Sequence, residues 1–172
     1  MIEHIFSCPI YVDKINLKLL DKVNKIIKKH KTNFVSNVGG YQSPSIKTTK
    51  DLTELFANID IKISQFYKRP LKFQSYWINK NNKYNYNKPH NHPGCLVSGV
   101  YYVNVPEDSG DIIFHAPYSD LVSSFMVEKD FHDLYIIKPK TNMLLLFPSW
   151  LKHSVEMSKS SKSRLSIAFN YS

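Results

Sequence analysis

The hydrophobic and polar positions follow a helical period in the first 70 residues of the chain. One helix is expected there with apolar positions at Leu17, Leu20, Val23 and Ile27 and a cap at Asn16 or Asp13. A second is expected from Asp51 to Tyr67, ended by Arg69-Pro70, with an apolar stripe at Leu52, Leu55, Phe56, Ile59, Ile63 and Phe66.

After Pro70 the period changes to two and β-forming residues dominate. The segments between the strands are rich in turn-forming residues, and the longest of them is Asn81–Pro89. Short strands at this spacing are typical of an antiparallel sandwich or barrel. We therefore predict an α+β class that is mainly β, a jelly roll with two N-terminal helices packed on one face. The expected strands are Phe73–Asn79, Leu96–Val103, Asp111–His115, Leu134–Ile137, Met143–Phe147 and Arg164–Tyr171.

Length and composition fit one globular domain, 1–172, in which 1–70 form a helical support region and 71–172 the β core. The chain is 42% hydrophobic and 22% charged, which excludes wholesale disorder. No apolar run approaches the roughly 18 residues of a membrane span, and the N-terminus lacks the plan of a signal peptide. We expect a cytoplasmic protein without membrane contact, and Cys8 and Cys95 as reduced side chains.

The net charge of +9 comes from 21 Lys and only 2 Arg against 14 acidic residues. A strongly basic chain raises the question of nucleic acid binding. Here the lysines are spread along the chain, and the densest group, between Lys22 and Lys31, fits the solvated face of a helix. Nucleic acid is therefore not expected as a partner. The scarcity of arginine makes Arg69 and Arg164 notable.

Three histidines have the spacing of a metal site. In an extended segment, His90 and His92 point to the same face because side chains alternate. His153 follows a buried strand and a turn, so it can approach them from the opposite sheet. Imidazole is a common ligand of iron, zinc, copper and nickel. Taken singly, each of these motifs is weak, and a surface histidine is its more common explanation.

The last strand carries an arginine and a serine on one face. Alternation places Arg164 and Ser166 together, and a guanidinium fork beside a hydroxyl can bind a carboxylate. A salt bridge at the edge of a strand is the alternative.

Together, these motifs resemble the iron(II)/2-oxoglutarate-dependent dioxygenase superfamily, whose members carry HxD/E…H and a downstream Arg-x-Ser/Thr. Ser98–Val103, Ser109-Gly110 and Ile112–Phe114 resemble its prolyl-hydroxylase-like members. Four runs are similar to a family of small 2OG-Fe(II) oxygenases common in marine bacteria and their phages. They are Gly39–Ser43, His90–Gly94, Ser98–Tyr102 and Leu146–Trp150.

The resemblance implies a double-stranded β-helix in which His90, His92 and His153 bind iron(II). It implies that Arg164 holds 2-oxoglutarate, assisted by Ser166, Tyr102 and Ser98, and that Trp77 and Asn79 line the pocket. Dioxygen is then the second cosubstrate, a peptide or small molecule the hydroxylated substrate, and succinate and CO2 the coproducts. If the protein is viral, the cytoplasm in which we expect it is that of the host cell. The oligomeric state stays open, a homodimer included.

The chain departs from the superfamily pattern at one position. His92 stands where the superfamily has a carboxylate, so three neutral imidazoles leave the full charge of the metal uncompensated. Asp111 is the alternative ligand. Two other functions also stay open. One is a cupin-like three-histidine dioxygenase that does not use 2-oxoglutarate, and the other is a non-enzymatic basic module that binds nucleic acid.

Overall fold

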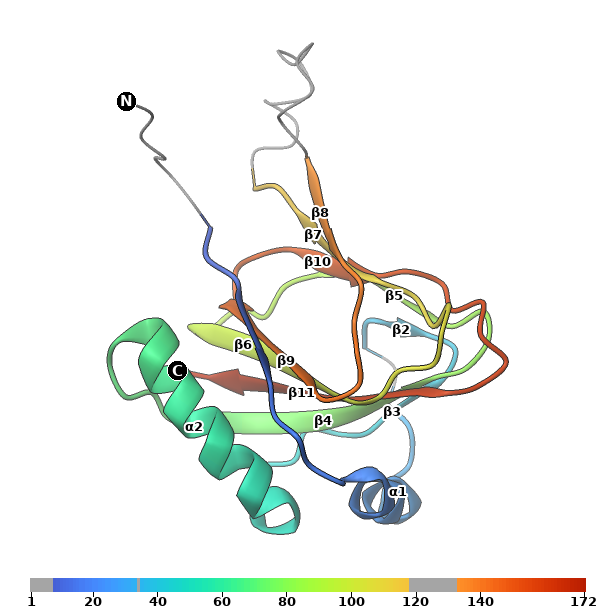
Figure 1. Ribbon diagram of the computed structural model, residues 1–172, viewed down its shortest axis with the longest axis horizontal. Coiled ribbons are helices and arrows are strands. Elements are labelled where there is room, and N and C mark those ends of the chain that lie inside the picture. Colours follow the sequence, from blue (N-terminus) through green and yellow to red (C-terminus); the bar gives the residue numbers. More distant parts are fainter. Residues whose placement is uncertain (1–7, 34, 118–132) are drawn as a thin grey trace.

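Two antiparallel sheets face each other and form a jelly roll, the double-stranded β-helix that the sequence predicts (Figure 1). The structure is a computed structural model that describes residues 8–33, 35–117 and 133–172. The six-stranded sheet has the order β1 (Tyr11–Lys14), β9 (Met143–Pro148), β6 (Val97–Asn104), β11 (Arg164–Tyr171), β4 (Phe73–Asn81) and β3 (Tyr41–Gln42). The five-stranded sheet has the order β2 (Asn37–Val38), β5 (Tyr86–His90), β10 (His153–Val155), β7 (Ile112–His115) and β8 (Leu134–Ile137).

One face of the six-stranded sheet packs against the helices, and the other lines a cavity. On β11, Leu165, Ile167, Phe169 and Tyr171 are buried in the core that the sheet shares with the helices. The alternate residues Arg164, Ser166 and Ala168 line a cavity between the sheets. The period-two pattern of β11 therefore predicts both faces correctly.

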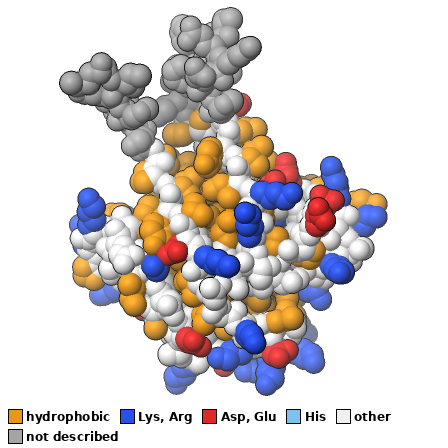
Figure 2. Space-filling view, viewed as in Figure 1, with side chains coloured by type: hydrophobic (Ala, Val, Ile, Leu, Met, Phe, Trp, Pro, Cys, Tyr) orange, Lys and Arg blue, Asp and Glu red, His pale blue; other side chains and the backbone are white. Residues whose placement is uncertain are grey.

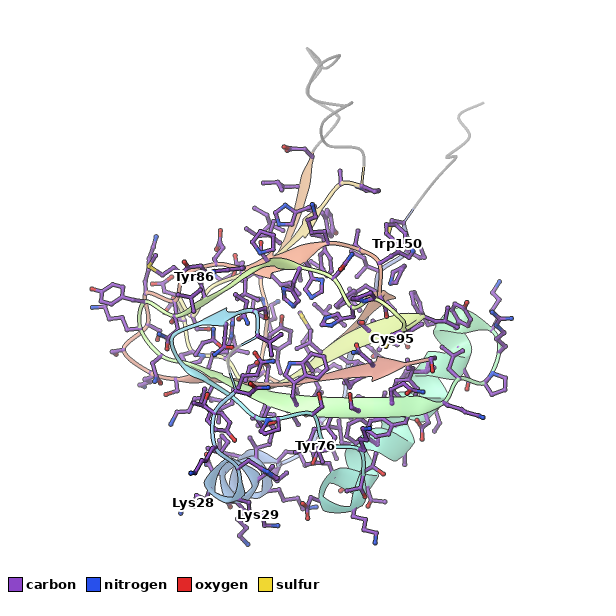
Figure 3. All side chains as sticks on the ribbon, turned by 180° about the vertical axis from the view of Figure 1, so that it is seen from behind. Lys28, Lys29, Tyr76, Tyr86, Cys95 and Trp150 are labelled. Atoms are coloured by element: carbon purple, nitrogen blue, oxygen red, sulfur yellow. The ribbon has the colours of Figure 1, made fainter. Side chains whose placement is uncertain are left out.

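The helices cover the outer face of the six-stranded sheet (Figure 1). They are α1 (Leu20–Lys29) and α2 (Thr53–Tyr67), and a 3₁₀ turn, Lys50–Leu52, precedes α2. Tyr76, on β4, is fully buried between the sheet and α2, with its ring centre 5.2 Å from that of Phe56 (Figure 3). The predicted stripe of α2 is confirmed from Leu52 to Ile63. In the part of the chain that the structure describes, no helix is long and apolar enough to span a membrane.

In the apolar stripe of α1, the buried residues at both ends lie one residue before the predicted ones, Leu19 instead of Leu20 and Ile26 instead of Ile27. Leu19, Val23 and Ile26 are buried, whereas Leu20 is 46% exposed. The Leu19-Leu20 pair offers two registers, and the one that continues to Ile26 places its side chains i, i+4 and i+7 on the sheet.

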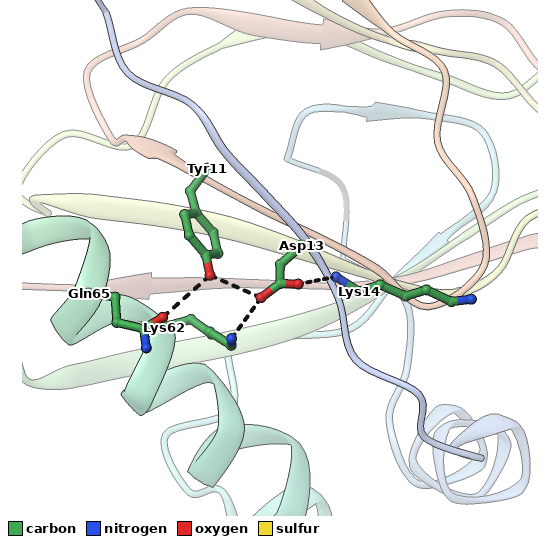
Figure 4. Close-up of polar contacts among 5 residues, drawn as sticks. All are labelled: Tyr11, Asp13, Lys14, Lys62 and Gln65. Atoms are coloured by element: carbon green, nitrogen blue, oxygen red, sulfur yellow. Dashed lines mark hydrogen bonds and ion pairs between the residues drawn. The ribbon is translucent and has the colours of Figure 1, made fainter.

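The first 70 residues contribute strands as well as helices. β1 pairs with β9, β3 with β4, and β2 with β5. One interpretation of the sequence made Asp13 the cap of α1. In the structure Asp13 lies on β1 and does not cap this helix. Its carboxylate lies 2.8 Å from Nζ of Lys62 and accepts a 2.9 Å hydrogen bond from the Tyr11 hydroxyl (Figure 4). These contacts lower the pKa of Asp13 and tie β1 to α2.

Two strands near the site were not predicted. β5 lies in Asn81–Pro89 and its continuation, a segment that the sequence indicated as a turn, and β10 has only three residues. Their pairing, His153 opposite His90, joins segments more than 60 residues apart. Such pairing is set by the sheet and not by local propensity.

Candidate metal centre

The three histidines predicted as ligands converge in the jelly roll. His90 ends β5, His153 begins β10, and the two are direct partners across the strands. His92 follows two residues after His90, and its backbone N–H donates a 2.9 Å hydrogen bond to the carbonyl of Ser149. Ligand atoms of all three side chains lie within 4.8 Å of one another. This is the only such group of His, Cys, Asp and Glu among the described residues.

Local hydrogen bonds orient two of the rings. Nδ1 of His90 lies 2.7 Å from the carbonyl oxygen of Lys88, and Nδ1 of His153 lies 2.9 Å from that of Leu151. A carbonyl oxygen only accepts, so each Nδ1 carries the proton and each Nε2 has a free lone pair. Metal-binding histidines are commonly oriented in this way.

Burial keeps the cluster neutral. Desolvation lowers the pKa of His92 to about 4 and that of His153 to about 3, and it also lowers the pKa of His90. Each positive ring would also repel the others. Three neutral imidazoles with convergent lone pairs therefore suit a divalent transition metal such as iron(II).

We expect the metal-free protein to lose stability as the pH falls from about 6.5 toward 4. Unfolded histidines titrate near 6.5, whereas His92 and His153 titrate at about 4 and about 3 in the folded state. In this window the unfolded chain binds more protons, so acid favours unfolding. Thermal unfolding at pH 7.5, 6.0 and 4.5 measures the slope, which His153→Leu should make shallower. An unchanged slope in His153→Leu would contradict this account.

No carboxylate belongs to the cluster in the described part of the chain. Asp111, the alternative ligand, lies outside it and lines a separate surface pocket with Asp108 and Glu156. The geometry therefore favours His92 over Asp111. His115 is also outside the cluster, and its Nε2 lies 2.9 Å from the hydroxyl of Ser154. His132 lies outside the described residues.

Arg164 lies in the same cavity as the histidines. It is only 2% exposed, and its Nη1 donates a 2.7 Å hydrogen bond to the carbonyl of Gly110. Gly110 has φ +89°, and a Cβ there would contact the carbonyl of Glu156, so the turn that holds Arg164 requires glycine. Nε of Arg164 has no partner, and no ion pair to the guanidinium forms among the residues described. Burial of a cation without a counterion is unfavourable, so this environment favours an anion beside the guanidinium.

Tyr102 and Ser166 lie beside this arginine. They are direct partners across β6 and β11, and both line the cavity. Burial raises the pKa of Tyr102 to about 12, so its hydroxyl stays a neutral hydrogen-bond donor. On β4, Asn79 is the partner of Ser166 and Trp77 that of Ala168, and both line the cavity. The other lining residues are Ser36, Asn87, Gly99, Val100, Ile112, Phe147 and Val155.

Ser98 is not among the residues that line this cavity. It shares a face of β6 with Tyr102, but four residues along a strand separate the two by about 13 Å. Its hydroxyl lies 2.8 Å from Oγ of Ser149 and 2.8 Å from Oδ1 of Asn170. The position therefore favours a role in holding the loop behind His92 over a contact to a cosubstrate.

Comparison with known proteins identifies the family. Residues 75–170, more than half of the chain, match the family described as "Putative 2OG-Fe(II) oxygenase". The chain belongs to this oxygenase family. No curated protein matched the sequence. As a member of the family, this oxygenase is an oxidoreductase of the dioxygenase type with iron(II) as cofactor and 2-oxoglutarate as cosubstrate.

Solved structures share the fold of this oxygenase at low sequence identity. A prolyl hydroxylase from Trichoplax adhaerens, in complex with a hypoxia inducible factor peptide, is 15% identical with a TM-score of 0.69, over 94% of this chain and 82% of that one. A prolyl-4-hydroxylase from Pseudomonas putida is 16% identical with a TM-score of 0.62, over 96% and 92%. HygX from Streptomyces hygroscopicus, with nickel, 2-oxoglutarate and hygromycin B bound, is 12% identical with a TM-score of 0.66, over 95% and 82%.

Sequence reasoning missed two polar residues of the cavity, Ser36 and Asn87. Nδ2 of Asn87 donates a 3.1 Å hydrogen bond to the hydroxyl of Ser36. Asn87 comes from the unpredicted β5, and Ser36 lies directly before β2. A prediction of β5 would have indicated Asn87. Ser36 follows only from the pairing of β2 with β5.

Proposed function

We propose that this oxygenase is a hydroxylase that couples the oxidation of 2-oxoglutarate to succinate and CO2 with the hydroxylation of a peptide or small molecule. The observation that carries the proposal is one cavity that contains three convergent neutral histidines and, on the opposite sheet, a buried arginine without an ion pair among the described residues. A metal and a dicarboxylate together complete such a cavity.

In this proposal His90, His92 and His153 hold iron(II) on one side and leave its other positions open. Arg164 binds the distal carboxylate of 2-oxoglutarate, and the hydroxyls of Ser166 and Tyr102 donate further hydrogen bonds. Bound iron(II) and 2-oxoglutarate together supply the activation of dioxygen. The apolar side chains of Val100, Ile112 and Phe147 line the cavity and exclude water from the reacting atoms.

The substrate enters, in this proposal, through a groove beside the histidines. The groove has a volume of about 360 Å³, which suits part of a small molecule or a peptide side chain. It shares Trp77, His90 and His92 with the inner cavity. Among the described residues that line it, Lys88 is the only Lys, Arg, Asp or Glu and the histidines are neutral, so the groove favours neutral or anionic substrates over cations.

The test is succinate release from purified protein supplied with iron(II), 2-oxoglutarate and dioxygen. Succinate that depends on all three supports the proposal. The cupin-like alternative predicts oxygen consumption without succinate, and it leaves Arg164 unassigned. A binding module predicts neither.

Weak, non-specific binding of nucleic acid is the expected result for the basic surface. Lysines are scattered over the visible face, with acidic residues between them (Figure 2), and Lys28 and Lys29 lie on the solvent side of α1 (Figure 3). The dissociation constant should be on the order of 10⁻⁴–10⁻⁶ M and rise steeply with salt. Fluorescence anisotropy with short DNA and RNA at two salt concentrations measures it. Nanomolar binding at about 200 mM salt that weakens when Tyr84 or Tyr86 is replaced would make nucleic acid the substrate.

Three further points stay predictions: the division into one domain of residues 1–172, a cytoplasmic location, and the oligomeric state. Cys8 and Cys95 are free thiols, as predicted.

A further inference from the structure

His92 is held differently from the other two histidines. The rings of His90 and His153 each have a hydrogen bond from Nδ1 to a backbone carbonyl, at 2.7 and 2.9 Å. Within the described residues no hydrogen bond to the ring of His92 forms, although its backbone N–H is fixed by Ser149. Something other than a hydrogen bond must therefore orient this ring.

Trp77 packs against the ring of His92. The two ring centres are 5.3 Å apart, with 48° between the planes. Trp77 lies in the middle of β4, where its partner across β11 is Ala168, a small residue that leaves room for the indole. The indole lines both the inner cavity and the outer groove, so it stands at the boundary between them.

We propose that Trp77 is a positioning residue, and that its indole fixes the His92 ring in the orientation that completes the metal site. The inference rests on the proposed function. A ring without a hydrogen bond can turn about its Cβ–Cγ bond, and only packing restricts that motion.

The test compares Trp77→Leu, Trp77→Phe and the control Trp150→Leu. The side chain of Trp150 is 53% exposed and lines neither the inner cavity nor the outer groove, so its replacement probes the loss of a tryptophan that does not face the histidines (Figure 3). Co(II) is titrated into each protein, and the visible absorption bands report both affinity and coordination. Trp77→Leu should raise the dissociation constant about tenfold or more, the effect typical of losing a residue that orients a ligand. Trp77→Phe should restore most of the affinity, and Trp150→Leu should change nothing.

Repeating the Trp77 substitution in the His92→Ala variant separates an effect on the orientation of His92 from a general loss of structure. In His92→Ala, Trp77→Leu should have no further effect on Co(II) affinity, because the ring that it positions is gone. If Trp77→Leu fails to fold, Trp77→Met keeps more volume and is compared in the same way. Wild-type affinity in a folded Trp77→Leu or Trp77→Met protein, or an equal loss in the His92→Ala background, overturns the inference. If neither His92→Ala nor His153→Ala weakens Co(II) binding, the proposed metal site itself is wrong and the inference falls with it.

Discussion

Replacing His153 by alanine should leave the protein almost free of iron(II). His153 is 5% exposed, neutral, and oriented by Leu151, so it is the most rigidly placed of the three histidines. Three imidazoles are the only donors that converge among the residues described. Removing one should cost more affinity than the roughly 10- to 100-fold typical of residues that only orient a ligand. His90→Ala and His92→Ala should also reduce metal content sharply.

Metal content after dialysis, together with the Co(II) absorption spectrum, measures these losses. His115→Ala is the matched control, because His115 lies on neighbouring β7 but outside the cluster. Asp111→Ala is the second control. The ligand assignment is wrong if His92→Ala retains iron while Asp111→Ala loses it.

The parts of the site that the sequence predicted lie in segments with a strong local pattern. In β11, eight residues alternate between apolar and polar or small, so the pattern determines which face Arg164 and Ser166 occupy. For His90 and His92, a spacing of two residues is sufficient to place both rings near one point. These predictions need no knowledge of distant partners.

The parts that it did not predict depend on distant pairing. β10 has three residues and β5 is rich in Asn, Lys and Pro, so neither shows a local strand signal. Pairing with distant segments defines them: β5 and β10 pair with each other, β10 also pairs with β7, and β5 also pairs with β2. Ser98 was expected beside Tyr102 and does not line the cavity, for a related reason. Alternation gives the face of a residue, but it does not give the position of the residue along the cavity.

The contact between Arg164 and Gly110 is a further case. The arginine is oriented by a backbone carbonyl, and a carbonyl has no signature in the sequence because every residue carries one. The sequence could therefore single out Arg164 as the candidate anchor for a carboxylate. It could not show that the cation is held at one end only and has no ion pair among the described residues.

Arg164→Ala should weaken the binding of 2-oxoglutarate by about thirty-fold or more. Truncating one partner of a buried charge pair costs roughly 2–5 kcal/mol, and each 1.4 kcal/mol is about tenfold in affinity. Arg164→Lys should also be damaging, because an ammonium group cannot reproduce the planar fork of the guanidinium. Calorimetric titration of 2-oxoglutarate into the protein loaded with Mn(II) measures both variants without turnover.

The other arginine of the chain supplies the control. Arg69 is exposed and stacks on Tyr67, with its guanidinium 5.0 Å from the ring centre, so Arg69→Ala should bind 2-oxoglutarate as the wild type does. Arg164→Ala should keep its thermal stability, because the guanidinium makes one hydrogen bond, to Gly110, and has no ion pair in the described part of the chain. Removing a buried charge that has no counterion relieves an unfavourable desolvation, which offsets the packing and the hydrogen bond lost with the side chain. A folded Arg164→Ala protein that binds 2-oxoglutarate with unchanged affinity would exclude the proposed anchor and favour a three-histidine dioxygenase that does not use this cosubstrate.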